Sequence, residues 1–270
     1  MAVSLMDVWN IETFDGNLLA ELKANETLVR KYIVTDREIF LEREAAALKA
    51  AYRTNPYAET YYRFLEDLGR DMETRTIRAW HYTRLTDAEV EQLRTIGIAL
   101  SSLDATRRRL EAQVAAGVIS DEIANALFAA SPFQHSEQVG PRSDKFWLTS
   151  HPVEIGDSGV TLLLANWGGE AVYFWLNDAQ LQAAVASIGK PRVIEVAVPL
   201  EATRHAHLAG KAVVAAFARS LGCRPDFRAF DLYTARVLGP DAILAVHTEG
   251  EATFVEIGKA YPEKFSPMAK

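Results

Sequence analysis

The sequence predicts an α+β protein, in which a helical N-terminal module precedes a mixed, mainly antiparallel sheet with flanking helices. Residues 1–75 contain segments whose apolar residues recur at helical spacing, whereas short runs of aromatic and β-branched residues begin at residue 76. These runs are joined by connections of unequal length, which is typical of α+β folds and not of regularly alternating α/β folds. We therefore expect a helical module over residues 1–75 and an α+β domain over residues 76–270.

The composition is that of a folded globular protein. Apolar residues make up 49% of the 270 residues and charged residues 24%, so a sizeable core is expected. The net charge of −7 argues against a broad nucleic-acid-binding surface, which needs clustered cations, and the single cysteine excludes an intrachain disulfide framework. No apolar run reaches the roughly 18 residues of a membrane span and no secretory signal is visible, so we expect a soluble, cytoplasmic, bacterial-type protein.

Three helices are expected in the N-terminal module. The first covers residues 17–32, where leucines recur at helical spacing. The second begins at Thr35, because Thr35 and Glu38 have the spacing of a capping box, and it continues to about residue 52. Asn55-Pro56 ends it, and the third helix covers about residues 57–72. We recognise no chemical motif in this module.

Strands and helices are mixed after residue 76. Strands are predicted over residues 77–83, 146–150, 171–176, 192–198, 242–246 and 253–257. Helices are predicted over residues 86–97, 102–116, 120–130, 158–167, 177–188 and 208–221. The segment 133–145 is polar and is expected to be an irregular loop, the kind of segment in which substrate choice often resides.

His81 is the histidine with the most suggestive surroundings. It ends a predicted strand between Trp80 and Tyr82, and Thr83 lies on the same face of that strand as His81. From this segment alone, a histidine in the core of an amphipathic strand is also an adequate interpretation. The segment by itself therefore leaves both a structural and a functional role open.

Other kinds of site have weaker sequence support. His205 and His207 could present two imidazoles on one face of a strand, but cysteine ligands and a well-placed carboxylate are missing, so we predict no metal site. The chain lacks the Gly-x-Ser-x-Gly motif of many hydrolases and the P-loop lysine motif. Gly168-Gly169 follows a helix and precedes a predicted strand, which is the reverse of the order in a dinucleotide-binding Rossmann motif.

Three short motifs, in their order along the chain, resemble those of the ADP-ribosyltransferase superfamily. The segment 80–84 (Trp-His-Tyr-Thr-Arg), followed by a helix that ends in Ile-Gly-Ile at 96–98, is similar to its opening strand and helix. The aromatic strand with hydroxyl residues at 146–150 is similar to its second signature, and Glu249-Gly250-Glu251, directly before a predicted strand, to its third. The similarity covers about residues 76–258 and implies an ADP-ribosyltransferase-like fold.

The resemblance also implies a site and a substrate. Its catalytic residues would be His81, Glu251 and Glu249, and the residues that contact NAD would be Tyr82, Thr83, Thr149, Ser150, Trp167 and Tyr173. Which of the two glutamates is catalytic stays open. Cleavage of the bond between nicotinamide and ribose develops positive charge on the ribose, which a nearby carboxylate stabilises more strongly in the transition state than in the ground state.

The function implied by the resemblance is NAD-dependent transfer of ADP-ribose to an unidentified acceptor, or hydrolysis of NAD. A non-catalytic interaction protein that keeps the fold, and an unrelated α+β enzyme, stay open as alternatives. The acidic balance of the chain favours a protein, a small molecule or water over duplex DNA as the acceptor. The helices of residues 1–75 could form a homodimer contact, cover the site or complete the core.

Overall fold

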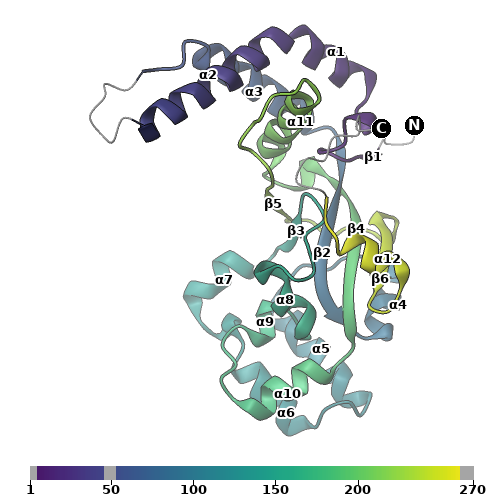
Figure 1. Ribbon diagram of the computed structural model, residues 1–270. Coiled ribbons are helices and arrows are strands. Elements are labelled where there is room, and N and C mark those ends of the chain that lie inside the picture. The colour runs from purple at the N-terminus through teal and green to yellow at the C-terminus, as the bar shows by residue number, and fades with distance from the viewer. Residues whose placement is uncertain (1–4, 46–52, 262–270) are drawn as a thin grey trace. The chain divides into compact units, whose positions relative to one another are not determined.

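The computed structural model has the α+β fold class expected from the sequence, and it describes residues 5–45 and 53–261. Its described strands form one six-stranded sheet in the order β5-β3-β2-β4-β6, with β1 also paired to β2 (Figure 1). The strands are β1 (Leu5–Met6), β2 (Thr76–Leu85), β3 (Phe146–Thr149), β4 (Lys190–Pro199), β5 (Asp231–Thr234) and β6 (Ile243–Thr248). β1 is parallel to β2, whereas β3 is antiparallel to β2 and β5, and β4 is antiparallel to β6, so the sheet is mixed as predicted.

The chain divides into two compact units. The first unit contains the described residues up to 78 together with 199–230, and the second unit contains residues 79–198 and 231–261. The first unit is therefore assembled from two stretches of chain that are far apart in the sequence. The predicted boundary at residue 75 lies close to the point where the chain leaves this unit, but the unit also takes in the later helix α11.

The first unit is mainly helical. It comprises β1, η1 (Ile11–Thr13), α1 (Gly16–Ala24), α2 (Glu26–Ala45), α3 (Ala58–Met72), η3 (Leu200–Ala202) and α11 (Ala206–Ser220). Helices α3 and α11 lie side by side, with ten of the fifteen residues of α11 buried (Figure 1). Gly210 permits this close approach, since a Cβ atom there would lie 3.3 Å from the backbone of Gly69. The buried residues of α11 are thus a large part of the core of this unit.

The predicted start of the second helix at Thr35 is wrong. The helical region breaks at Asn25, and α2 then runs without interruption from Glu26 to Ala45. Buried Val29, Ile33 and Ile39 continue one apolar stripe through Thr35, so tertiary packing overrides the local capping pattern. The predicted end of this helix near residue 52 lies outside the described residues. The third predicted helix is confirmed as α3, and the short strand β1 was not predicted.

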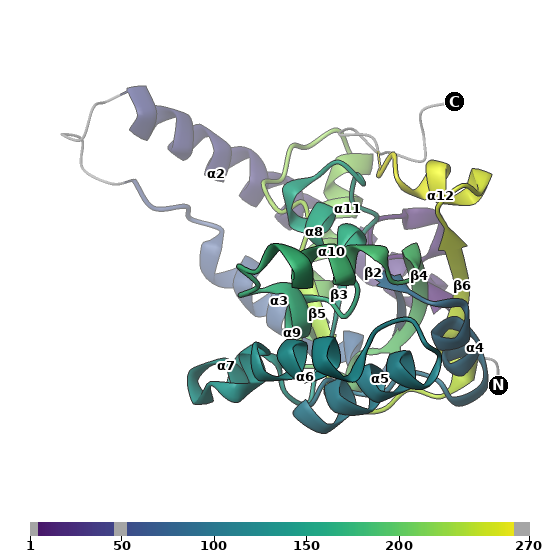
Figure 2. The same ribbon diagram turned by 90° about the horizontal axis from the view of Figure 1, so that it is seen from below.

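Most helices of the second unit occur where the sequence predicts them. They are α4 (Asp87–Ile96), α5 (Leu103–Ala115), α6 (Asp121–Ala129), η2 (Pro132–Gln134), α7 (Ser136–Arg142), α8 (Ser158–Ala165), α9 (Glu170–Tyr173), α10 (Ala179–Ser187), η4 (Pro240–Ala242) and α12 (Ala252–Ile257). In Figure 2, α4 and α12 both lie beside β6, one on each side of it. The segment 133–145, predicted to be an irregular loop, instead contains the end of η2 and α7 because Phe133 packs into the core.

Helix α4 shows how local sequence signals define an element. The Thr86 hydroxyl accepts a hydrogen bond from the backbone of Glu89, and the Glu89 carboxylate accepts one from the backbone of Thr86, which completes the predicted capping box. The helix ends at Gly97, whose φ of +94° is unfavourable for other residues. A Cβ atom at Gly97 would also lie 2.1 Å from the carbonyl oxygen of Leu238. Both the positive φ and this close approach therefore require glycine at this position.

Two predicted strands are not strands. In residues 171–176, the first three residues belong to α9 and the chain then turns, with Val172 and Leu176 buried and Phe174 45% exposed. Residues 253–257 belong to α12, in which Phe254 is buried and Val255 is 55% exposed. Aromatic and β-branched residues favour strands only weakly, and packing decides their structure here. The four-residue strand β5 was not predicted at all.

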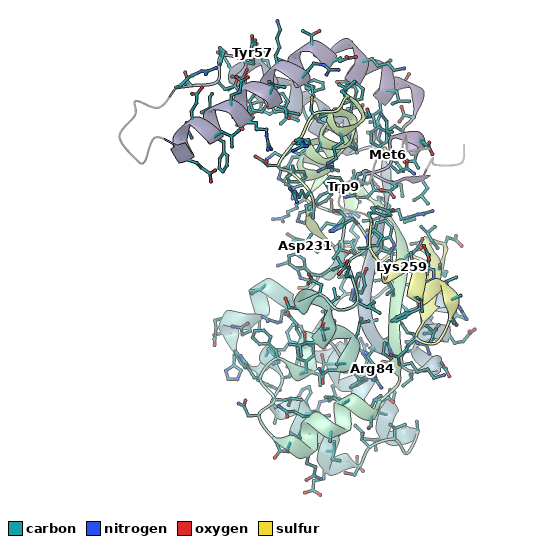
Figure 3. The ribbon with its side chains drawn as sticks, in the orientation of Figure 1. Met6, Trp9, Tyr57, Arg84, Asp231 and Lys259 are labelled. Atoms are coloured by element: carbon teal, nitrogen blue, oxygen red, sulfur yellow. The ribbon has the colours of Figure 1, made fainter. Side chains whose placement is uncertain are left out.

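The second unit has two described apolar clusters. One joins α5, α6, α9 and α10 and is composed of Leu110, Ile119, Ala124, Leu127, Trp167, Val172, Leu176, Val185 and Ile188. The other packs α8 and α12 on the sheet and is composed of Trp80, Tyr82, Val160, Leu164, Val193 and Phe254. Between them, the guanidinium of Arg84 donates a hydrogen bond of 2.8 Å to the carbonyl of Ile188 (Figure 3). The sheet is thus anchored to the helical cluster at the end of β2.

Candidate functional site

His81 lies inside β2 and not at its end, because the strand continues to Leu85. Successive side chains of a strand point to opposite faces. Trp80 and Tyr82 pack with Phe254 of α12, so His81 points to the other face of the sheet. The predicted strand end at residue 83 is therefore slightly early, and the histidine stands on rigid backbone with strand on both sides.

The imidazole of His81 is held by two neighbours. Its Nδ1 atom lies 2.8 Å from the carbonyl oxygen of Trp147, and its ring centroid lies 4.2 Å from that of Phe146. A carbonyl can only accept a hydrogen bond, so Nδ1 carries the proton and donates it. Nε2 consequently has a free lone pair, with which it can accept a hydrogen bond from a ligand.

The protonation state of His81 is set by its surroundings. Burial lowers its pKa to about 4, the nearby Arg109 guanidinium lowers it further, and only the hydrogen bond to Trp147 opposes this shift. Part of the ring is nevertheless exposed, so the shift coexists with access from solvent. A neutral, oriented imidazole at physiological pH is suited to hydrogen bonding with a neutral hydroxyl.

Arg109 of α5 belongs to a polar network around Glu89. The Arg109 guanidinium donates a hydrogen bond of 2.8 Å to one carboxylate oxygen of Glu89, and the indole Nε1 of Trp167 donates one of 2.9 Å to the other. The guanidinium also lies 4.7 Å from the centroid of the Trp167 ring. Burial alone would raise the pKa of Glu89, but Arg109 and the hydrogen bonds from Thr86 and Trp167 hold it below its usual value. Glu89 is thus an anion that fixes a cation beside His81.

A second polar and aromatic group surrounds the end of β3. The rings of Trp147 and Tyr233 meet edge to face at 4.8 Å, and Trp147 is 43% exposed. Asp231 pairs with Thr149 in the sheet and begins β5 (Figure 3). Burial raises the pKa of Asp231 and lowers that of His151, and each charge partly offsets the shift of the other. The sequence prediction missed Arg109, Glu89, Asp231 and Tyr233, because only tertiary structure brings α4, α5 and β5 to this place.

The predicted NAD-contacting residues near His81 are mostly buried. Tyr82 is 2% exposed, and its hydroxyl is engaged with the backbone of Val153 on the face opposite His81. Thr83 and Ser150 are buried as well. The Thr149 hydroxyl donates a hydrogen bond of 2.8 Å to the carbonyl of His151. Of these four residues, only the partly exposed Thr149 has a side chain that a ligand can reach.

Trp167 and Tyr173, which were predicted to contact NAD through their rings, belong to a core cluster. Trp167 is 0% exposed, and both its indole nitrogen and its ring are occupied, by Glu89 and Arg109. Tyr173 is partly buried against the same cluster, and burial raises its pKa to about 12. In this structure Trp167 therefore positions Arg109 and is not accessible for stacking on nicotinamide.

Glu249 and Glu251 lie away from His81. They follow β6 and precede α12, whereas the sequence predicted a strand after them. Glu251 accepts a hydrogen bond from the backbone of Thr248 and begins α12. That helix packs through Phe254 on the Trp80 face of the sheet, and β6 is two strands from β2. The structure thus does not bring either glutamate together with His81.

His205 and His207 lie in the first unit, where His207 is packed against Gly69 and burial lowers the pKa of His205. Among the residues that the structure describes, no group of three His, Cys, Asp or Glu side chains is arranged to hold a metal ion. Within the same residues, no helix combines the length and apolar character needed to cross a membrane.

No family model, curated protein or solved structure matches the chain. The interpretation of the site therefore rests on its geometry and on the motif-level resemblance described above.

Proposed function

We propose that the second unit binds NAD through the His81 face of the sheet, as an ADP-ribosyltransferase-like protein. One observation carries this proposal: the imidazole of His81 is partly exposed, and its hydrogen bond to the Trp147 carbonyl fixes its tautomer so that Nε2 can accept a hydrogen bond, while the charge of Arg109 is near enough to lower its pKa. NAD presents ribose hydroxyls and a negatively charged pyrophosphate within one molecule. A lone pair and a guanidinium on rigid elements match these two groups.

Each residue would have a defined role. His81 Nε2 would accept a hydrogen bond from a ribose hydroxyl, while Nδ1 stays bound to the carbonyl of Trp147. Arg109 would contact the pyrophosphate, and Glu89 and Trp167 would restrict its motion. The ring of Phe146, which lies 4.2 Å from that of His81 and on the same face of the sheet, would border the bound dinucleotide.

The reaction proposed for this site is cleavage of the bond between ribose and nicotinamide. Nicotinamide leaves with the bonding electron pair, and the oxygen or nitrogen of the acceptor forms the new bond to the ribose and loses a proton. The acceptor would be a protein group, a small molecule or water. A carboxylate beside the ribose would be the group that stabilises the developing charge.

The position of Glu249 and Glu251 favours a second candidate function, a non-catalytic NAD-binding interaction protein. Both carboxylates lie with α12, whose Phe254 packs on the sheet face opposite His81. Binding of NAD does not need Glu249 or Glu251. Cleavage of NAD at this site would need a carboxylate from another residue. The two candidates share the binding site and differ only in chemistry.

One experiment separates these candidates and tests their common basis. NAD binding is measured by calorimetry and nicotinamide release by chromatography, for the unaltered protein and for His81→Ala, Arg109→Lys and Glu251→Gln. Arg108→Lys is the matched control, because Arg108 is exposed on the same helix. We expect His81→Ala and Arg109→Lys to weaken binding about tenfold, or about 1.4 kcal/mol, and Arg108→Lys to leave it unchanged.

The outcomes are distinct. Release of nicotinamide that is lost in His81→Ala supports the transferase, and its survival in Glu251→Gln would assign the carboxylate role to another residue. Binding without release supports the interaction protein. Absence of NAD binding, or binding that both His81→Ala and Arg109→Lys leave unaltered, contradicts the proposed site.

A further inference from the structure

The first unit contains a hollow that the proposed function does not use. Its volume is about 180 Å³, and a neighbouring hollow of about 330 Å³ shares four of its lining residues, Tyr32, Asp36, Tyr62 and Asp226. The lining comes from α2, α3, α11 and the segment after α11, all within the first unit. The combined space suits a small elongated molecule.

Three tyrosines form the base of this hollow. The rings of Tyr32 and Tyr61 are stacked with centroids 3.7 Å apart and planes 7° apart, and Tyr62 meets both edge to face. The hydroxyls of Tyr32 and Tyr62 are hydrogen bonded to each other at 2.9 Å. Burial raises the pKa of Tyr32 and of Tyr61 above the usual value, so both hydroxyls keep their protons at physiological pH.

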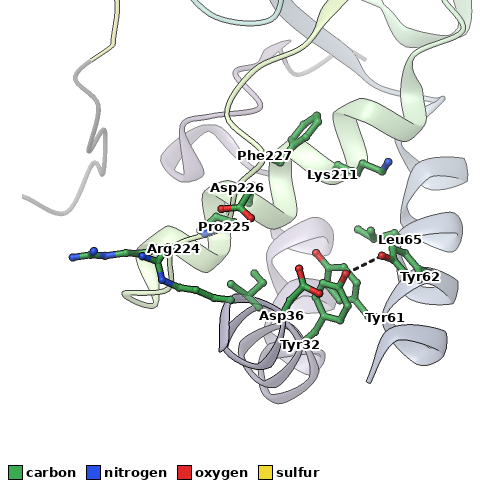
Figure 4. A pocket seen from close by; sticks show the side chains of 13 residues that line it. Tyr32, Asp36, Tyr61, Tyr62, Leu65, Lys211, Arg224, Pro225, Asp226 and Phe227 are labelled. Atoms are coloured by element: carbon green, nitrogen blue, oxygen red, sulfur yellow. Dashed lines mark hydrogen bonds between the residues drawn. The ribbon is translucent and has the colours of Figure 1, made fainter. Parts of the chain in front are cut away.

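Tyr61 is the residue whose bonding is incomplete. It is only 8% exposed, yet its hydroxyl makes no hydrogen bond to any residue that the structure describes. In Figure 4 this hydroxyl points into the same space as the carboxylates of Asp36 and Asp226. Although the residue is buried, the hydroxyl itself is open to the hollow, so it can take a hydrogen-bond partner from there. Its open hydroxyl indicates that the hollow accommodates a polar group.

The two carboxylates are also without partners. Within the described part of the chain, neither Asp36 nor Asp226 forms a hydrogen bond or an ion pair. Three cations also line the hollow, Arg37, Lys211 and Arg224, but none of them pairs with these carboxylates, and Figure 4 shows Arg224 directed away from the tyrosines. The carboxylates of Asp36 and Asp226 therefore keep their negative charges without an ion-pair partner among the described residues of the first unit.

We propose that this hollow binds a small organic cation whose head donates N–H hydrogen bonds, an alkylammonium or a guanidinium. The head would donate to Asp36, Asp226 and the open Tyr61 hydroxyl, and its positive charge would lie against the tyrosine rings. The uncharged aliphatic part would extend into the neighbouring hollow beside Ile39 and Phe40. Arg43 and Arg53 also line that hollow, and Arg53 is ion-paired there with Glu38 and Glu42. Carboxylates with aromatic rings recognise such cations, whereas an anion would meet two unpaired negative charges.

Isothermal titration calorimetry of the full chain tests this site, with butylamine as the cationic probe and butyrate as an anionic probe of comparable length. We expect saturable binding of butylamine that weakens with added salt, and no binding of butyrate. Asp36→Asn and Asp226→Asn should each weaken butylamine binding at least about tenfold, and Tyr61→Phe should weaken it several-fold. Glu66→Gln is the matched control, since it removes one exposed charge from α3 outside the hollow, and should change nothing.

Conservative substitutions at exposed carboxylates are expected to leave the fold intact, and circular dichroism of each variant verifies this. Absence of butylamine binding overturns the proposal, as does binding that all three variants leave unchanged. Binding of butyrate in place of butylamine also overturns it, because it would assign the hollow to the basic residues of its lining.

Discussion

At the scale of single residues, the second unit is characterised by polar side chains whose charge state is fixed by their neighbours. The Trp147 carbonyl determines which nitrogen of His81 carries the proton, and the carboxylate of Glu89 determines where Arg109 can be. Neither partner is close in sequence to the residue that it controls. Local sequence can therefore identify His81 as a candidate but cannot reveal its chemical state.

The ring of His81 is expected to stay neutral down to about pH 4. Its pKa in the folded protein is about 4, against 6.5 for an unperturbed histidine. Because the unfolded chain takes up this proton first, the contribution of His81 to stability is complete above pH 6.5 and is lost as the pH falls toward 4. A titration followed by NMR of the ring nitrogens should also show Nδ1 as the protonated nitrogen. Protonation near the unperturbed value would contradict the burial described here.

Glu89→Ala is expected to destabilise the protein by about 2–4 kcal/mol, because it leaves Trp167 Nε1 and the Arg109 guanidinium without their acceptor. Urea denaturation measures this difference. Glu91→Ala, on the exposed side of the same helix, is the control and should change stability by less than about 0.5 kcal/mol. Equal effects of the two substitutions would show that the Glu89 network adds nothing to stability.

At the scale of elements, helices with clear end signals were predictable and short aromatic segments were not. Helix α4 begins and ends where Thr86, Glu89 and Gly97 predict, since both of its caps are built from local residues. Residues 171–176 and 253–257 have strand-like compositions, but residues 171–173 and 253–257 are helical, with Val172 and Phe254 buried. Their structure is decided by the surfaces on which they pack, and a single sequence does not contain that information.

The same limit applies to the candidate site. His81 could be singled out because it lies in a strand with aromatic neighbours, and that strand is confirmed. Glu249 and Glu251 were placed by the expectation of a strand after residue 251, which is a helix in the structure. Arg109 belongs to a run of three arginines, 107–109, and such a run on a helix by itself indicates only a solvated face. Its contact with Trp167 joins elements that are far apart in sequence, and no spacing rule predicts it.

Gly97→Ala is expected to cost about 2–4 kcal/mol of stability, because the added Cβ atom meets the carbonyl oxygen of Leu238 and the backbone has φ +94°. Gly117→Ala is a suitable comparison, since Gly117 also has a positive φ but nothing lies near its Cβ position. It should cost only about 1 kcal/mol, from backbone strain alone. Thermal denaturation of both variants checks the difference, and equal losses would exclude the steric contribution of Leu238.

At the scale of the whole molecule, the two compact units do not correspond to two consecutive segments of chain. The first unit needs α11, which is reached only after residue 198, and α11 contributes Ala212, Val213 and Phe217 to its core. Sequence periodicity correctly indicates that residues 1–75 are largely helical. It cannot show that a later helix completes their core, because that depends on where the chain returns.

A fragment of residues 1–78 is therefore expected to lack cooperative structure when it is made alone. The apolar faces of α3 and α2 would be exposed without α11. Adding residues 199–230 through a flexible linker should restore a cooperative thermal transition, measured by circular dichroism. The design is geometrically reasonable, since the backbone of Leu200 donates a hydrogen bond of 2.9 Å to the carbonyl of Arg75. Cooperative folding of residues 1–78 alone would contradict the division of units given above.

The stacked tyrosines of the first unit have a spectroscopic consequence. Of the five tryptophans, Trp80, Trp147, Trp167 and Trp175 belong to the second unit, and only Trp9 belongs to the first. Two nearly parallel phenol rings at 3.7 Å couple their electronic transitions, which gives the first unit its own near-ultraviolet dichroism. In a Trp9→Phe variant, indole fluorescence would arise only from the second unit, and the coupled dichroism of the stacked pair would report on Tyr32 and Tyr61 of the first unit. The two units can thus be followed by two different intrinsic signals, without an added label.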